Sequence, residues 1–289
     1  MTAPSERKFE RSAPEDGPEA ACRPRPCWQT ILLGLAAGCG GSLIGVGGGI
    51  IMVPVLTIWG LTQKRAQGTS LVVIFALVPV SIYTYWRLGN IDFGFAVPLA
   101  IGGVVGSMLG SDLALRFSNR LLARLFGVFL ILIALRLIFV PGLPEHHVAA
   151  DLADFTRLVE TTLLGVLAGM AAGFFGVGGG VIFVPTGVLL AGLQQAFAQG
   201  SSLTAMFPTT LVGIFNYHRK REIEWSLVWW MIPGAWLGAV IGSWGADVLG
   251  KIREGRVLTI VFALFLLYTG AAKLIGAAHA SQNLTGRRA

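Results

Sequence analysis

The sequence predicts an all-α polytopic membrane protein built from two homologous repeats. The first observation is composition: 54% of the 289 residues are apolar, 13% are charged, and the mean hydropathy is +0.70. Soluble domains carry about 25% charged residues, and apolar stretches such as 121–140 and 257–275 reach the ~20 residues that cross a bilayer. The lipid bilayer is therefore the first predicted partner. The net charge of +7 is typical of Lys and Arg in cytoplasmic loops and gives no reason to predict nucleic-acid binding.

The second observation is that the two halves of the chain match. The pentapeptide Gly-Val-Gly-Gly-Gly occurs at Gly45–Gly49 and again at Gly176–Gly180, and a proline follows each copy, Pro54 and Pro185. Further matching blocks follow in the same order in both halves: Ala66–Leu71 and Ala198–Leu203, Tyr85–Arg87 and Tyr217–Arg219, and the glycine ladders Gly102/Gly106/Gly110 and Gly234/Gly238/Gly242. Several blocks kept in order indicate a gene duplication.

The repeats divide the chain into five predicted parts. These are a disordered N-terminal tail at 1–27, transmembrane repeat 1 at 28–140, a linker loop at 141–158, transmembrane repeat 2 at 159–276 and a C-terminal tail at 277–289. Each repeat is predicted to hold four apolar helical segments, at about 29–60, 66–88, 95–117 and 119–140, and at about 159–192, 197–218, 226–249 and 254–276. The N-terminal tail combines prolines with mixed charge, which is typical of disorder.

The first segment of each repeat (29–60 and 159–192) is predicted to be broken. Glycine and proline cost about 1 and 3 kcal/mol per residue in a helix relative to alanine, so the pentapeptides with Pro54 and Pro185 are the predicted helix breaks. The pieces on either side are too short for a bilayer core of ~30 Å. Each segment therefore crosses as a broken helix or enters and returns as a re-entrant hairpin. The hairpin would invert repeat 2 relative to repeat 1 and leave most Lys and Arg on the side of the tail, which the positive-inside rule favours.

The glycine pentapeptides are the first candidate substrate site. Glycine lets a backbone amide approach a bound group closely, and a helix that starts just after the break would point its positive N-terminus at an anion. The alternative is close helix packing through small residues. The predicted substrate-binding glycines are Gly45, Gly47, Gly48, Gly49, Gly176, Gly178, Gly179 and Gly180.

A polar block near the start of the second segment of each repeat is the other candidate. Its amides and hydroxyls are neutral hydrogen-bond donors that could replace water around an oxyanion. N-capping of the helix and hydrogen bonds between helices remain the alternatives. The predicted residues are Gln67, Gly68, Thr69, Ser70, Gln199, Gly200, Ser201 and Ser202.

The other polar residues give little sign of further chemistry. Asp112 and Arg116, like Asp247 and Lys251, have the i, i+4 spacing of a local ion pair, and the G-x-x-x-G ladders are predicted packing faces. The three cysteines are odd in number and do not suggest a disulfide framework. No catalytic arrangement of Ser, His, Cys and Asp stands out in the sequence, so we predict no enzyme, no catalytic residues, no cofactor and no metal.

Over residues 28–276 the doubled G-x-G-G-G-x-x-x-x-P motif, each copy followed by A-Q-G-[ST]-S-L and an aromatic-basic turn, resembles the sulfite exporter TauE/SafE family. The resemblance implies a multi-pass protein of the bacterial inner membrane that exports or takes up sulfite, a sulfonate or a related small organic anion.

The preferred hypothesis is a transporter that binds its anion between the two repeats and works by alternating access. An anion channel on the same scaffold, and a membrane scaffold or sensor without transport, are the alternatives. The sequence leaves open the substrate, the direction of movement, the coupling ion, the role of the tail and the oligomeric state, a homodimer included.

Overall fold

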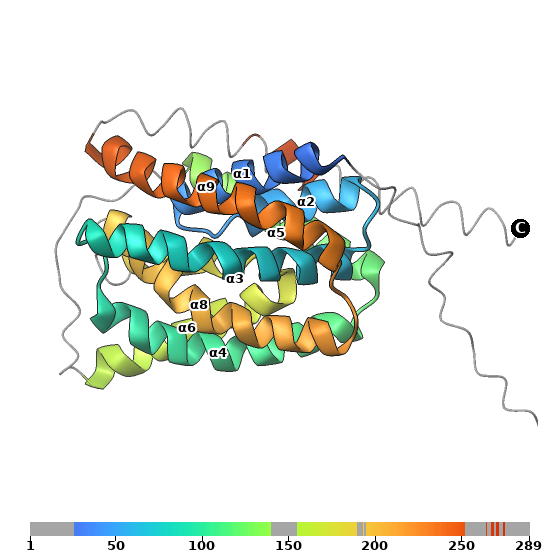
Figure 1. Ribbon diagram of the computed structural model, residues 1–289. Helices are drawn as coiled ribbons and strands as arrows, with labels where there is room; N and C mark the ends of the chain where they lie inside the picture. Colours follow the sequence, from blue (N-terminus) through green and yellow to red (C-terminus); the bar gives the residue numbers. More distant parts are fainter. Residues whose placement is uncertain are drawn as a thin grey trace, which may run out of the picture.

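The computed structural model describes residues 26–139, 155–189, 193 and 195–251 and scattered positions between 264 and 274, and these residues are helical apart from short connections (Figure 1). The helices are α1 (Cys27–Ile44), α2 (Gly49–Ile58), α3 (Gln63–Arg87), α4 (Phe93–Arg116), α5 (Asn119–Phe139), α6 (Phe155–Phe175), α7 (Gly180–Leu189), α8 (Gln195–Arg219) and α9 (Trp225–Lys251). The C-terminal tail and almost all of the predicted 1–27 tail, 141–158 linker and 254–276 segment lie outside the described residues, although α6 begins within the last part of the linker.

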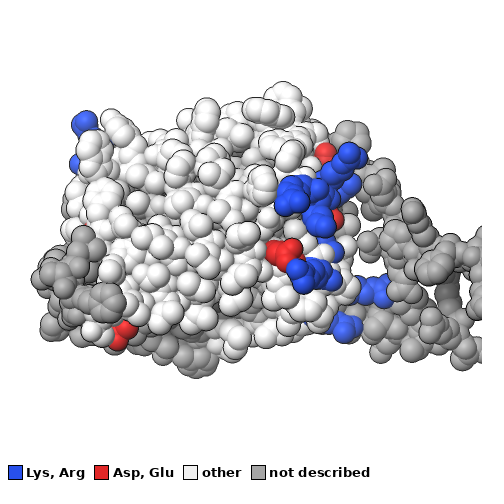
Figure 2. All heavy atoms as spheres, turned by 90° about the horizontal axis from the view of Figure 1, so that it is seen from below, with Lys and Arg blue, Asp and Glu red and all other residues white. Residues whose placement is uncertain are grey.

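Among the described residues, five helices are long and apolar enough to cross a membrane: α1, α3, α4, most of α6 and most of α9. Their outer surfaces carry large exposed apolar side chains, among them Trp229 at 68% and Leu167 at 61% exposure. Figure 2 shows one such face with a wide uncharged middle, and with charged side chains gathered at its two ends. An apolar belt between charged ends suits a bilayer, so the chain is a multi-pass membrane protein.

Most of the positive charge on that face lies at one end (Figure 2). We call it the basic end; α3 starts there, and α4 and α8 finish there. Two contacts join the start of α3 to its neighbours at this end. Lys64 Nζ donates to the carbonyl of Leu115 in α4 at 3.1 Å, and the Arg65 guanidinium lies 3.7 Å from the carboxylate of Glu224, just before α9.

The break in the first segment lies at the glycines. α1 ends at Ile44 and α2 begins at Gly49, and between them Gly45, Gly47 and Gly48 have φ of +77°, +76° and +78°. Residues other than glycine are destabilised by about 1–2 kcal/mol in this left-handed region. The glycines of the pentapeptide adopt it without that cost, so α1 ends there. α6 and α7 are separated in the same way, with φ of +67°, +79° and +90° at Gly176, Gly178 and Gly179.

The prolines do not make the break, which corrects the prediction for Pro54 and Pro185. Pro54 lies inside α2, and Pro185 lies within the bounds of α7. A proline removes one N–H donor and leaves a carbonyl of the preceding turn unpaired, but these helices are short and continue through it. The Pro54 carbonyl itself accepts a hydrogen bond from Thr57 Oγ1 at 2.7 Å.

After the break the chain turns back. α2 returns beside α1, since a Cβ on Gly48 would meet Ala37, and one on Gly40 would lie 2.8 Å from the Ile51 side chain. With 10 residues at 1.5 Å each, α2 spans about 15 Å, half of a bilayer core. α1 and α2 therefore form a hairpin whose open end lies at the basic end (Figure 1).

The glycine ladders are packing faces, as predicted. A Cβ on Gly102, Gly106 or Gly110 of α4 would collide with backbone carbonyls of α6, and one on Gly234, Gly238 or Gly242 of α9 would collide with carbonyls of α1. The helix backbones approach this closely only because those side chains are absent. Each hairpin is thus held against a long helix from the other half of the chain.

Candidate functional site

The two pentapeptides meet inside the molecule. We call them elbow 1 (Gly45–Gly49) and elbow 2 (Gly176–Gly180); all ten residues are buried. A Cβ on Gly49 would lie 2.7 Å from Val177 Cα, and one on Gly180 would lie 2.6 Å from Val46 Cα. The elbows therefore touch backbone to backbone.

Each elbow is held by the polar block of the other half of the chain. Ser202 Oγ of α8 donates to the carbonyl of Gly45 at 2.7 Å, and Ser70 Oγ of α3 donates to the carbonyl of Gly176 at 2.5 Å. N-capping does not explain these hydroxyls of α3, because Thr62 caps that helix by accepting from the Arg65 amide. Both serines instead bond to a carbonyl in the other half of the chain, as the alternative of hydrogen bonding between helices predicts.

The polar blocks divide between two places. The first and last residues of each block face the elbows, namely Gln67 and Ser70 in one block and Gln199 and Ser202 in the other. The two middle residues of each block pack against loops. Thr69 Oγ1 accepts from the Glu224 amide at 3.0 Å, and Ser201 Oγ accepts from the Asp92 amide at 2.8 Å. Gly68 and Gly200 lie against the carbonyls of Glu222 and Asn90.

Two tyrosines that were not among the predicted site residues join this arrangement. Tyr85 Oη donates to the Ser42 carbonyl at 2.9 Å and lies 3.1 Å from Gln199 Oε1. Tyr217 Oη lies 3.0 Å from Gln67 Oε1 and 3.2 Å from the Gly173 carbonyl. Both are fully buried. Their recurrence at the same place in both halves is the sequence signal that could have identified them.

The two glutamines differ in one respect. Gln199 Nε2 donates to the Leu43 carbonyl at 3.1 Å. Gln67 Nε2 is buried and has no hydrogen-bond partner among the described residues. A buried amide without an acceptor loses the hydrogen bonds that it makes in water, so this nitrogen is the donor at the site that a ligand could satisfy.

The elbows also leave backbone donors unused. The Gly48 carbonyl accepts from the amides of Ile51 and Met52, both at 3.0 Å, which starts α2. Within the described part of the chain, no carbonyl accepts from the amides of Gly49 or Ile50, nor from Gly180 or Val181 at the start of α7. First-turn amides are where a helix binds anions, because its partial positive charge gathers there.

Two apolar side chains fill the space between the elbows. Met206 Cε would collide with a Cβ on Gly47 or on Gly178, and Met206 Sδ would be 2.9 Å from a Cβ on Gly180. Ile74 would be 3.1 Å from a Cβ on Gly47. Both side chains are fully buried. These two side chains therefore occupy the space between the elbows, and a ligand that binds there requires them to move.

The predicted ion pair on α4 is confirmed as a local one. Arg116 Nη2 lies 2.6 Å from Asp112 Oδ2, and the two side chains are 74% and 52% exposed. An exposed pair with this spacing stabilises a helix by a few tenths of a kcal/mol. The corresponding side chains of Asp247 and Lys251 lie outside what the structure describes.

Known proteins resemble this chain along most of its length. The family model for the sulfite exporter TauE/SafE matches residues 30–186 and, a second time, 161–288. The chain is 29% identical over 258 residues to the probable membrane transporter protein YunE of Bacillus subtilis, a match that covers 82% of this chain and 93% of that protein. A probable membrane transporter protein of Xylella fastidiosa is 28% identical over 255 residues, 84% of this chain and 94% of the relative. No solved structure matches.

Proposed function

Since this chain belongs to the sulfite exporter TauE/SafE family, whose relatives named above are probable membrane transporters, we propose that it carries a small anion, sulfite or a related sulfonate, across the bacterial inner membrane.

The meeting of the two glycine elbows is the observation that carries this proposal. It brings the free first-turn amides of α2 and α7 to one buried place, and Gln67, whose Nε2 has no partner among the described residues, lies against Gly176 of elbow 2. Every one of these groups is a donor, and no carboxylate hydrogen-bonds to the elbows in the described residues. A site of neutral donors and helix N-termini suits an oxyanion without a fixed positive charge.

The arrangement of the halves supports inverted repeats. Gln67 near the start of α3 contacts Tyr217 near the end of α8, while Tyr85 near the end of α3 contacts Gln199 near the start of α8. The two helices therefore run antiparallel. In Figure 1 the α1–α2 hairpin opens at the basic end, whereas α6 begins and α7 finishes at the opposite end. Inverted repeats with broken helices at their interface are the architecture that secondary transporters use.

The filled space between the elbows favours a carrier over an anion channel. A channel needs a continuous path, and here Met206 and Ile74 fill the space between the elbows. In the proposed cycle one half rocks against the other, these side chains withdraw, and the amides of the elbows meet the anion from one side at a time. The antiparallel α3–α8 pair, with Phe75 stacked on Phe207 at 4.8 Å, is the contact about which such a motion would occur.

Proteoliposome flux tests the proposal. Purified protein is reconstituted, a proton gradient is imposed, and accumulation of radiolabelled sulfite, sulfoacetate and taurine is measured. We expect uphill accumulation of at least one of them, and a loss of about tenfold or more in Gln67→Met. The control is Gly89→Ala, in a turn where no atom would meet the new Cβ. Flux no greater than in empty liposomes for all three compounds would overturn the proposal.

A further inference from the structure

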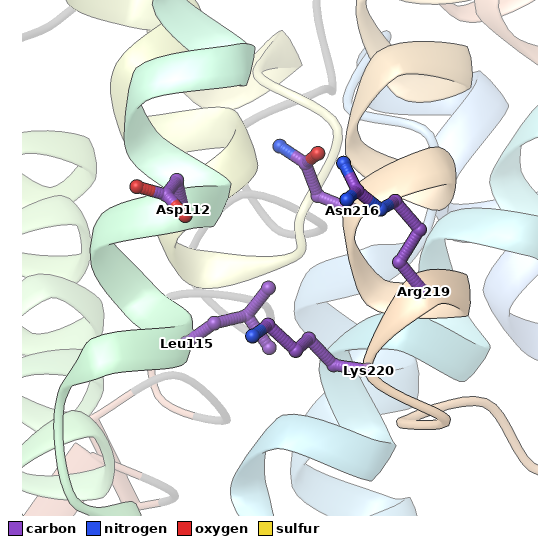
Figure 3. A pocket seen from close by; sticks show the side chains of 5 residues that line it. All are labelled: Asp112, Leu115, Asn216, Arg219 and Lys220. Atoms are coloured by element: carbon purple, nitrogen blue, oxygen red, sulfur yellow. The ribbon is translucent and has the colours of Figure 1, made fainter.

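A pocket lies between α4 and α8 at the basic end, well away from the elbows. It measures about 210 Å³ and is lined by Asp112, Leu115, Asn216, Arg219 and Lys220 (Figure 3). In Figure 3 the Lys220 side chain extends from the turn after α8 toward Leu115 of α4, and Arg219 lies next to Asn216. The pocket is thus bounded on one side by donors at the end of α8 and in the turn after it, and on the other side by α4.

The pocket is electropositive. Asp112 is already paired with Arg116 at 2.6 Å. No carboxylate in the described residues forms an ion pair with Arg219 or Lys220; the Arg219 guanidinium carbon lies 5.6 Å from the centre of the Phe215 ring. Two cations therefore remain to attract an anion, since Asn216 Nδ2 already donates to the Met108 carbonyl and to Ser111 Oγ. A recessed charged surface raises the local concentration of counter-ions.

A line of polar side chains leads inward from this pocket along the α4–α8 interface. Asn216 Nδ2 donates to Ser111 Oγ at 2.7 Å, and Ser111 Oγ donates to the Ser107 carbonyl at 2.6 Å. Ser107 Oγ then donates to the carbonyl of Thr209 at 2.9 Å. These hydroxyls are at most 1% exposed. We call Asn216, Ser111, Ser107 and Thr209 the polar seam.

The inner end of the polar seam reaches elbow 2. A Cβ on Gly103 would lie 2.5 Å from Thr209 Oγ1 and 3.2 Å from Phe183 Cζ, and a Cβ on Gly179 would lie 3.0 Å from the same Phe183 ring. Phe183 is fully buried. One aromatic ring thus separates the last hydroxyl of the seam from the glycine backbone of elbow 2.

The corresponding interface in the other half, between α3 and α9, lacks such a seam. Matching of the repeated blocks puts Leu77 where α8 has Thr209 and Ala239 where α4 has Ser107. Ser243, the counterpart of Ser111, is buried, and its Oγ has no partner among the described residues. The polar lining is therefore a feature of the α4–α8 interface and not a general property of the packing.

We propose that the pocket is an access site for a small oxyanion and that the polar seam is its route from the basic end to elbow 2, with Phe183 as the barrier. Arg219 and Lys220 would take the anion from water, and the side chains of the seam, Asn216, Ser111, Ser107 and Thr209, would exchange their present hydrogen bonds for bonds to the anion and so replace its hydration on the way in. This inference rests on the proposed function, because it gives the route to the same elbows.

Thiol accessibility tests the route without a transport substrate. Ser111→Cys and Ser243→Cys are each made in a chain whose Cys22, Cys27 and Cys39 are replaced by Ser. Inside-out membrane vesicles are treated with a negatively charged or a positively charged thiosulfonate reagent, and the remaining thiol is then counted with a maleimide-linked polymer. Each rate is divided by the rate of the same reagent with a free thiol in solution. The intrinsic reactivities of the two reagents then cancel, and the remaining difference is the effect of the protein on access to the cysteine.

The expected result is that the anionic reagent modifies Ser111→Cys about tenfold faster than Ser243→Cys, and faster than the cationic reagent does. Adding Arg219→Gln and Lys220→Gln should slow the anionic reagent about fivefold, whereas Arg87→Gln at the other end should not change the rate. If Ser111→Cys does not fold, Asn216→Cys at the mouth of the seam takes its place. Equal rates at the two interfaces, or no effect of the pocket cations, would overturn the route while leaving the flux result of the proposed function standing.

Discussion

Gly48→Ala tests how tightly the backbone of elbow 1 packs against its surroundings. Gly48 has φ +78° and lies against the backbone of Ala37, where a Cβ would collide with the carbonyl oxygen. Gly89 provides a matched control, because its φ is +73° and no atom lies within 4 Å of the position of a new Cβ. The two substitutions therefore impose the same backbone conformation on alanine and differ in their surroundings.

The expected magnitudes follow from that difference. Alanine in the left-handed region costs about 1–2 kcal/mol at either position. At Gly48 an overpacking term of about 1–3 kcal/mol is added, since the obstructing atom is backbone and not the end of a flexible side chain. The elbow variant should therefore lose about 2–5 kcal/mol in all, and the turn variant no more than about 2 kcal/mol.

The assay is the apparent melting temperature of the detergent-purified protein, read from the monodisperse peak in size-exclusion chromatography after heating. One kcal/mol corresponds to roughly 2 °C or more, so Gly48→Ala should melt clearly below Gly89→Ala. Equal melting temperatures for the two variants would refute the tight elbow, because the backbone strain that they share would then account for the whole effect.

Three further predictions use the same assay. Met206→Ala should cost about 2–5 kcal/mol because it empties the space between the elbows, and Met206→Leu less than about 1.5 kcal/mol; similar losses would mean that Met206 does not fill that space. Ser202→Ala should cost about 0.5–1.5 kcal/mol through the lost bond to elbow 1, whereas the exposed Ser226→Ala should change stability by less than about 0.5 kcal/mol. Gln67→Met should be less destabilising than Gln199→Met, since only the Gln199 amide nitrogen has a protein acceptor; the reverse order would show that Gln67 Nε2 is bonded within the protein.

The broken segments and the packing ladders could be predicted because glycine acts through its own backbone. Gly45–Gly49 needs no partner to make a helix unlikely, and Gly102, Gly106 and Gly110 form a surface whichever helix covers it. The prediction for Pro54 was wrong because the low helix propensity of proline does not by itself decide where a helix breaks. Here the glycines a few residues earlier already end the helix, and Pro54 lies inside the next one.

The partners of these residues could not be predicted, because they are set by long-range packing. Nothing local to Ser202 or Gly45 indicates that one binds the other's carbonyl across the molecule. Met206 and Ile74 look like ordinary apolar residues in the sequence, and only the fold puts them between the elbows. The polar seam was missed for the same reason, since Ser107 and Ser111 lie on α4 while Thr209 and Asn216 lie on α8.

Protection of Met206→Cys by a candidate anion tests the central claim most directly. In the cysteine-free chain, this thiol lies between the two elbows, and its rate of modification by the anionic thiosulfonate reagent is measured at increasing sulfoacetate concentration. We predict a slow reaction that falls in a saturable way as the anion fills the space beside the free amides. A rate that neither sulfoacetate nor taurine lowers at any concentration would contradict an anion site between the elbows.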